Sequence, residues 1–159
     1  MTTHIFRISI IDDFEDTECY REIEIPVGYS LSSFAEGIVT VFNFDFDHAF
    51  GFYSDLTRTY MRSQVRYELF ADMDDADSYA DASGEAKGLS VKKTKVGKAF
   101  TEPGQKMQFI FDYGDEWRFL VELIGAGEKK KGRRYPLVLK EVGEAPEQYP
   151  AWDEDEGGV

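Results

Sequence analysis

Three carboxylates crowd one predicted turn, where Asp112, Asp115 and Glu116 stand between two aromatic runs. Asp112 and Glu116 would face each other across an antiparallel hairpin. Like charges in this arrangement destabilise the hairpin unless a cation intervenes. A divalent metal with oxygen ligands would supply that charge, as would Arg118 or Arg21. The sequence favours a simpler interpretation, in which the Asp side chains accept hydrogen bonds from the backbone N–H groups of their own turn.

His48 is one of two histidines and follows Asp47 directly. Neighbours in an extended segment point to opposite sides, so this adjacency does not orient the imidazole, and a hydrogen-bonded structural histidine is favoured. The alternative is a hydrolase-like enzyme that uses the turn carboxylates and His48, with or without a divalent metal. The chain shows no Ser/His/Asp order, no cysteine nucleophile and no glycine-rich phosphate loop. We therefore expect no cofactor and no bound metal.

A hairpin over residues 106–124 must position the turn. Apolar and aromatic residues alternate on both sides of Gly114 and Asp115, which is typical of two paired strands. A loop of three or five residues pairs Phe111 with Trp117 and turns both toward the core, whereas a slip of one residue would exchange the faces of a strand. The same register predicts the pairs Phe109/Phe119, Met107/Val121, Ile110/Arg118 and Gln108/Leu120.

A second hairpin and a helix are predicted before residue 50. Residues 4–11 and 19–25 are β-rich runs that pair, with Arg21 on the same face as Ile23 and Ile25. A helix begins after Ser30 as N-cap and ends near residue 43. Its apolar stripe at helical spacing consists of Leu31, Phe34, Ile38, Val41 and Phe42.

The remaining segments are predicted with weaker patterns. The predictions are an extended segment at 60–70, a mobile acidic loop without a specific ligand at 72–85, a strand at 89–95, a helical turn at 96–100 and an edge strand at 135–139.

Length and charge narrow the class of protein. The chain has 159 residues and a net charge of −13, which fits one domain, placed at 1–142, and an irregular acidic tail at 143–159. The positive charge gathers in residues 87–140, and its basic run at 129–134 is interpreted as solvated. The overall acidity makes nucleic acid an improbable partner. A single cysteine, no apolar run of membrane-spanning length and no signal pattern indicate a cytoplasmic protein without a membrane partner.

Several motifs together resemble the plasmid pRiA4b ORF-3-like family. They are Tyr113-Gly114-Asp115-Glu116-Trp117, the strand Tyr20–Pro26 with Arg21, Asp47-His48-Ala49-Phe50, and Gly143-Glu144-Ala145-Pro146-Glu147. The chain departs from the family pattern at Arg118-Phe119, where the family commonly has a polar residue followed by His, and at Glu147-Gln148-Tyr149. The resemblance implies an α+β fold with a mainly antiparallel sheet and implies no established activity.

From the residues and the resemblance together we predict an α+β fold, a mainly antiparallel β-sheet packed against one principal helix, with short helical turns. The favoured function is a non-enzymatic binding or interaction module with a protein or small-molecule partner, and the alternative is the hydrolase-like enzyme. The candidate site residues are Arg21, His48, Asp112, Asp115, Glu116 and Trp117. We expect Arg21 or His48 to lie within contact distance of Asp112 or Asp115.

Overall fold

The computed structural model describes residues 2–11, 18–72 and 88–149. Almost all of the acidic loop predicted to be mobile, and the last ten residues of the predicted tail, lie outside these ranges. Residues 143–149 contain no helix or strand, and the division into a domain and a tail stays a prediction. None of the described helices is long and apolar enough to cross a membrane.

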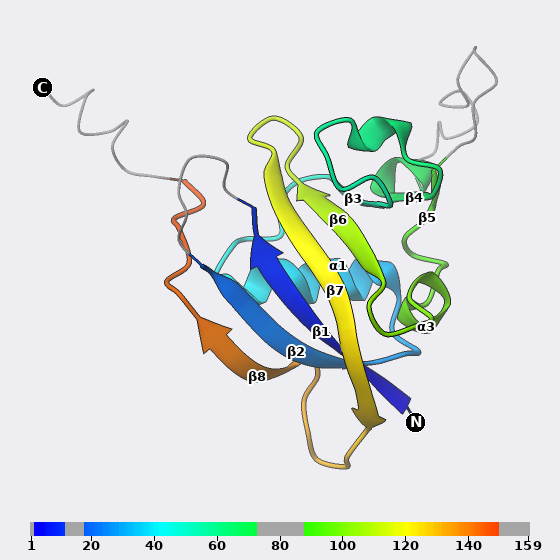
Figure 1. Ribbon diagram of the computed structural model, residues 1–159, viewed down its shortest axis with the longest axis vertical. Coiled ribbons are helices and arrows are strands. Elements are labelled where there is room, and N and C mark those ends of the chain that lie inside the picture. Colours follow the sequence, from blue (N-terminus) through cyan, green and yellow to red (C-terminus); the bar gives the residue numbers. More distant parts are fainter. Residues whose placement is uncertain (1, 12–17, 73–87, 150–159) are drawn as a thin grey trace, which may run out of the picture.

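Eight described strands form one sheet in the order β5-β4-β3-β6-β7-β1-β2-β8 (Figure 1). They are β1 (Thr2–Ile10), β2 (Tyr20–Pro26), β3 (Phe50–Tyr53), β4 (Arg66–Glu68), β5 (Leu89–Ser90), β6 (Lys106–Phe111), β7 (Trp117–Glu128) and β8 (Leu137–Val142). Neighbouring strands are antiparallel except β4 and β5, which are parallel. The sheet is therefore mixed, and β5 and β8 are its edges.

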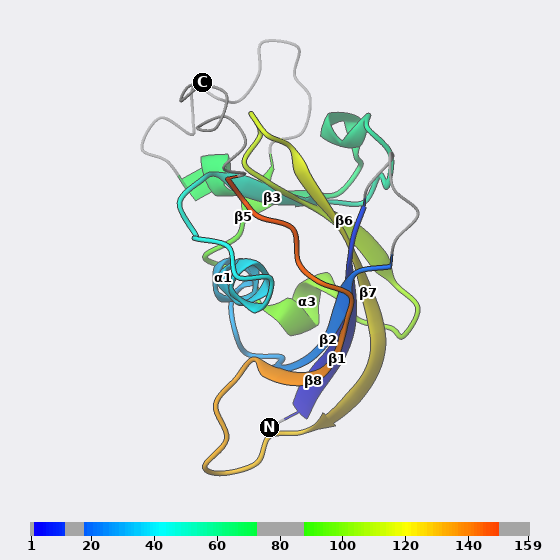
Figure 2. The same cartoon turned by 90° about the vertical axis from the view of Figure 1, so that its left-hand side faces the viewer.

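The helix α1 (Leu31–Val41) lies on one side of the sheet, with the short helix α3 (Val96–Ala99) beside it (Figure 2). The predicted cap is confirmed, because the N–H of Ser33 donates to Ser30 Oγ at 3.0 Å. Asn43 has a φ of 65° and ends the helical path where it was expected. The inner face of α1 is buried against the aromatic rings of the sheet.

The predicted fold class is wrong, because the chain is strand-dominated and its mixed sheet is not organised around a principal helix. The eleven residues of α1 span about 16 Å, whereas eight strands about 4.8 Å apart cover roughly 34 Å. Connectors cover much of the rest: the ring of Phe44 packs on Trp117, and that of Phe100 packs on Phe6. Aromatic side chains from irregular segments thus cover part of the sheet that the prediction assigned to a helix.

The register predicted for the central hairpin is confirmed. All five predicted pairs occur between β6 and β7, and residues 112–116 form an odd loop between the strands. Phe109, Phe111 and Phe119 are fully buried, and Trp117 packs against the same core from a partly buried position.

The other expectations have mixed outcomes. The first hairpin is confirmed, since β1 pairs antiparallel with β2. The segment 60–70 is not extended throughout, because the 3₁₀ helices η1 (Tyr60–Arg62) and η2 (Leu69–Asp72) flank the three-residue β4. The strand predicted at 89–95 shortens to the two residues of β5, and the edge strand predicted at 135–139 begins at Leu137.

Candidate functional site

The central turn is held by Asp112, which accepts hydrogen bonds from the backbone of its own loop. Asp112 Oδ1 lies 3.2 Å from the N of Gly114 and 3.4 Å from the N of Asp115. Asp112 itself has a φ of 63°, a left-handed conformation that aspartate tolerates better than most residues. The side chain of Asp115 is exposed. The favoured interpretation, that aspartate caps the turn, is therefore confirmed for Asp112.

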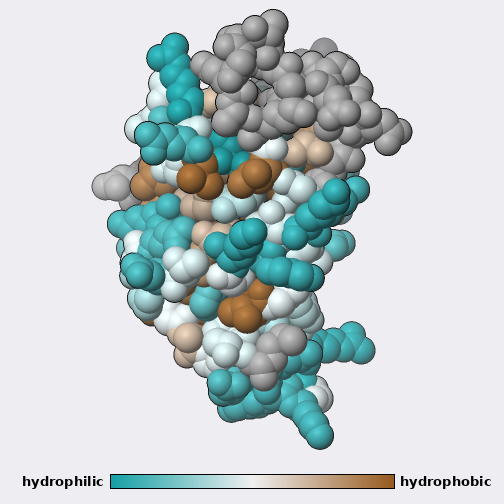
Figure 3. All heavy atoms as spheres, turned by 90° about the vertical axis from the view of Figure 1, so that its right-hand side faces the viewer, coloured by the Kyte–Doolittle hydropathy of each residue, from teal (hydrophilic) through white to brown (hydrophobic). Residues whose placement is uncertain are grey.

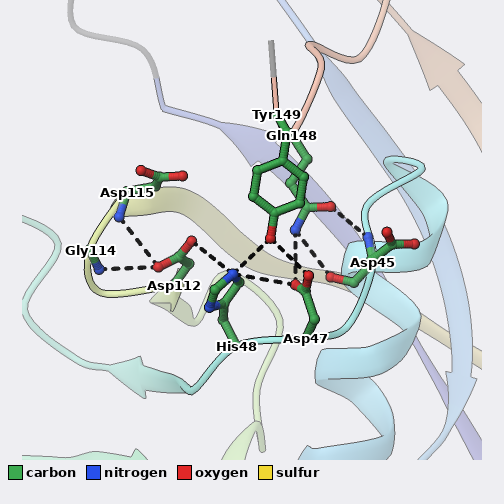
Figure 4. Close-up of polar contacts among 8 residues, drawn as sticks. All are labelled: Asp45, Asp47, His48, Asp112, Gly114, Asp115, Gln148 and Tyr149. Carbon is green, nitrogen blue, oxygen red and sulfur yellow. Dashed lines mark hydrogen bonds and ion pairs between the residues drawn. The ribbon is translucent and has the colours of Figure 1, made fainter. Parts of the chain in front are cut away.

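His48 joins the connector before β3 to this turn (Figure 4). Its Nε2 lies 3.3 Å from Asp112 Oδ2, 2.7 Å from the hydroxyl oxygen of Tyr149 and 3.6 Å from Asp47 Oδ1. Its ring stands edge-on to Phe111, with 6.0 Å between the ring centroids. The predicted contact of Arg21 or His48 with Asp112 or Asp115 is thus confirmed for His48 and Asp112.

The segment after β8 forms hydrogen bonds at this histidine. The hydroxyl of Tyr149 donates to Asp47 Oδ2 at 2.8 Å, and the hydrogen bond raises the pKa of Tyr149 to about 12, with smaller contributions from desolvation and from the charges of Asp47 and Asp112. Gln148 is buried and bonds the backbone of Asp45 in both directions, at 2.7 and 3.1 Å. Sequence reasoning missed Gln148 and Tyr149, whose one signal was the departure from the family pattern there.

Glu116 belongs to a different set of contacts from Asp112. Its Oε1 pairs with Arg58 Nη1, and its Oε2 accepts from the Tyr60 hydroxyl at 3.0 Å. Burial, and then this hydrogen bond, raise the pKa of Tyr60 to about 12. The expected opposition of the two turn carboxylates is relieved because each has its own partners. A metal is not required for that relief.

Arg21 is buried away from the turn and acts as a clamp at the sheet edge. Its Nη1 donates to the carbonyl oxygens of Val142 and Gly143, both at 3.1 Å, and its Nε donates to Val41 O at 3.3 Å. The guanidinium carbon stands 5.0 Å from the centroid of Phe42. These contacts fix the end of β8 against α1, and none of them involves a turn carboxylate.

Trp117 contributes packing. Its ring meets Phe44 edge-on at a centroid distance of 4.7 Å. Its Nε1 is buried and has no hydrogen-bond partner in the described part of the chain. A buried N–H without an acceptor destabilises the fold, so the indole contributes here through the packing of its ring and not through its N–H.

The described residues contain no group of three or more His, Cys, Asp or Glu side chains arranged to hold a metal ion. The contacts of His48 and Tyr149 join the turn, the connector before β3 and the segment after β8.

A cleft of about 620 Å³ lies elsewhere, between the outer face of α1 and β8. The helix lies close to Pro136, just before β8, because Gly37 has no side chain. The cleft is lined by Tyr29, Ser33, Glu36, Gly37, Thr40, Val41, Asn43, Tyr135, Pro136, Val138 and Glu141. Val138 and Glu141 are paired with Ile23 and Arg21 on β2 and share their helix-facing side. None of the candidate site residues lines the cleft.

A different side of the molecule is formed where β4, β5 and α3 lie. Much of its surface is hydrophilic or intermediate, and apolar side chains appear on it at separate places (Figure 3). Exposed apolar residues in or near these segments in the chain include Met61, Val65 and Leu89. Scattered exposed apolar residues are ordinary and indicate no binding surface.

Fold and site together define a small strand-dominated protein with a hydrogen-bonded hairpin turn and a separate cleft at one sheet edge. The chain belongs to the plasmid pRiA4b ORF-3-like protein family, which it matches over residues 4–159. The crystal structure of MM3350, a protein of unknown function from Methanosarcina mazei Go1, is similar with a TM-score of 0.69 at 21% identity, covering 98% of this chain and 78% of that one. No curated protein matches this chain. The resemblance seen in the motifs is thus confirmed.

Proposed function

We propose that this protein is a non-enzymatic binding module of the cytoplasm and that its ligand site is the cleft between α1 and β8. The observation that carries the proposal is the place of the cleft, which is lined by residues of α1 and β8 and by none of the turn. Concave surfaces of a few hundred Å³ are where proteins bind small ligands.

The contacts of the turn support a structural role over a catalytic one. A general base must reach the proton that it removes, with room for a substrate beside it. The Nε2 of His48 instead contacts Asp112 and Tyr149, and Asp112 Oδ1 caps its own turn. These bonds support a structural role, in which the turn holds residues 143–149 in place.

One observation favours the hydrolase-like alternative. The side chain of His48 is 38% exposed and stands between two carboxylates and a tyrosine with a raised pKa. Such a group of titratable side chains is a candidate site on physical grounds. This candidate needs a substrate to displace the Tyr149 hydroxyl from His48.

The test is a ligand-detected NMR screen of a fragment library against the whole chain and three variants. Thr40→Trp fills the cleft from an exposed position of α1, and Thr101→Trp places the same bulk at an exposed position outside it. His48→Ala removes the candidate catalytic group. We expect that fragments which bind the unmodified protein fail to bind Thr40→Trp and still bind the other two variants.

Hits that survive in Thr40→Trp and disappear in His48→Ala would contradict the proposal. Turnover of ester or phosphoester substrates that His48→Ala abolishes would establish the alternative.

A further inference from the structure

The geometry points to a small organic cation, an ammonium carried on an apolar skeleton, as the ligand of the cleft between α1 and β8. This inference rests on the proposed function, because it names the ligand class for the same cleft. It draws on three properties of the lining: two carboxylates without an ion pair in the described part of the chain, tyrosine rings and apolar surface.

Two carboxylates face the cleft from opposite walls. Glu36 comes from α1 and Glu141 from β8, and both side chains are exposed. Within the described ranges neither carboxylate has a hydrogen bond or an ion pair, and the described lining contains no Lys, Arg or His. Carboxylates that share a concave surface without a counter-charge attract cations from solution.

Two tyrosines supply surfaces that bind organic cations. Tyr29 and Tyr135 line the cleft and are partly buried, and the hydroxyl of Tyr135 is held by the N–H of Lys130 at 3.0 Å. The face of an aromatic ring attracts a cation that stands within about 6 Å of its centre. A ring that is already fixed loses little freedom when a ligand packs on it.

Apolar surface separates this ligand class from a bare metal ion. Pro136 and Val138 lie in the same lining as the carboxylates and tyrosines. An alkyl-substituted ammonium gains from contact with such surface, whereas a hydrated divalent ion does not. The volume of about 620 Å³ admits a small organic molecule.

Two features oppose a cation. Arg21 is the cross-strand partner of Glu141, but its guanidinium donates to backbone carbonyl oxygens and is not part of the lining. The basic run at residues 129–134 immediately precedes Tyr135 in the chain, and none of its residues is part of the lining either. The net charge of −13 for the whole protein works in the other direction and steers cations toward it. The test therefore includes an anionic probe.

Three probes of closely matched shape and different charge test the inference. They are choline, the neutral 3,3-dimethylbutan-1-ol and the anionic 3,3-dimethylbutanoate, each titrated into the isotopically labelled full chain and followed by NMR. We expect choline alone to give saturable shifts at cleft residues, with an affinity in the millimolar range that weakens as salt is raised.

The matched variants are two pairs of charge-neutralising substitutions. Glu36→Gln with Glu141→Gln removes both carboxylates of the cleft, and Glu102→Gln with Glu144→Gln removes two exposed carboxylates outside its lining. The first pair should weaken the affinity for choline about tenfold, because each exposed ion pair contributes modestly. The second pair should leave this affinity unchanged.

The outcomes separate the ligand class from the function. If the alcohol or the carboxylate binds the cleft as well as choline does, or if choline fails while library fragments bind there, the ligand class is wrong and the proposed function stands. If neither the probes nor the fragments bind the cleft, both are wrong. Choline shifts that the cleft variants leave unchanged would also overturn the inference.

Discussion

Gly37 of α1 lies so close to Pro136 that no side chain fits between them: a Cβ added at Gly37 would stand 2.9 Å from Pro136 Cγ. Glycine inside a helix lowers its stability by about 1 kcal/mol relative to alanine, so its presence here has a structural reason. The close approach sets the helix against the segment that leads into β8. Both residues line the cleft.

Gly37→Ala should lower the free energy of unfolding by about 1 kcal/mol, because overpacking against a rigid ring exceeds the gain in helix propensity. Urea denaturation measures this change. Thr40→Ala, at an exposed position of the same helix, is the control and should be neutral or slightly stabilising. Stabilisation by Gly37→Ala would show that Pro136 moves aside freely.

Trp117→Ala should cost about 3 kcal/mol of stability, since the indole fills space against Phe44 and leaves a cavity when removed. Trp117→Phe should cost less than about 1 kcal/mol, because it keeps a ring and removes a buried N–H that has no partner in the described structure. Equal losses for the two variants in urea denaturation would contradict this account of Trp117.

Asp112→Ala should destabilise the protein by about 1–2 kcal/mol, because the turn loses its cap and His48 loses a partner. Asp112→Asn should cost roughly half as much, since asparagine tolerates a positive φ and its oxygen still accepts from the loop. Asp115→Ala is the control and should lie within about 0.5 kcal/mol of the parent. Thermal unfolding of the three variants would refute the capping role if Asp115→Ala were the most damaging.

Tyr149 should ionise near pH 12, above the ordinary tyrosine value of about 10. Because its pKa is raised in the folded state, its contribution to stability is complete below about pH 10 and is lost as the pH rises through 12. An ultraviolet titration of the parent minus Tyr149→Phe isolates this group. Asp47→Asn removes the charged acceptor and should bring the midpoint down. An unshifted midpoint in the parent would contradict the hydrogen bond between Tyr149 and Asp47.

The hairpin and the helix were predictable because local rules decide them. The alternation of side chains leaves one register for Phe111 and Trp117 with an odd loop, and Ser30 has the chemistry of an N-cap. Arg21 or His48 was expected near Asp112 or Asp115, because a turn carboxylate needs a neighbouring partner, and His48 meets that expectation at Asp112.

The cleft and the hydrogen bonds of Tyr149 at His48 were not predictable, because they depend on contacts between distant segments. Tyr149 reaches Asp47 across about a hundred residues of sequence, and no periodicity reports such a contact. Arg21 was expected at the turn, yet it is satisfied by carbonyl oxygens at the end of β8. The balance of strand and helix was misjudged because the aromatic side chains that cover the sheet come from irregular connectors.

The most direct test of the proposed function is a crystal structure of the whole protein soaked with the fragments that bind it in solution. The cleft between α1 and β8 should hold the fragments, in contact with lining residues such as Glu36 and Tyr135, while the bonds among His48, Asp112 and Tyr149 stay intact. Fragments that displace the Tyr149 hydroxyl and contact His48, with the cleft empty, would contradict the account and favour the enzyme.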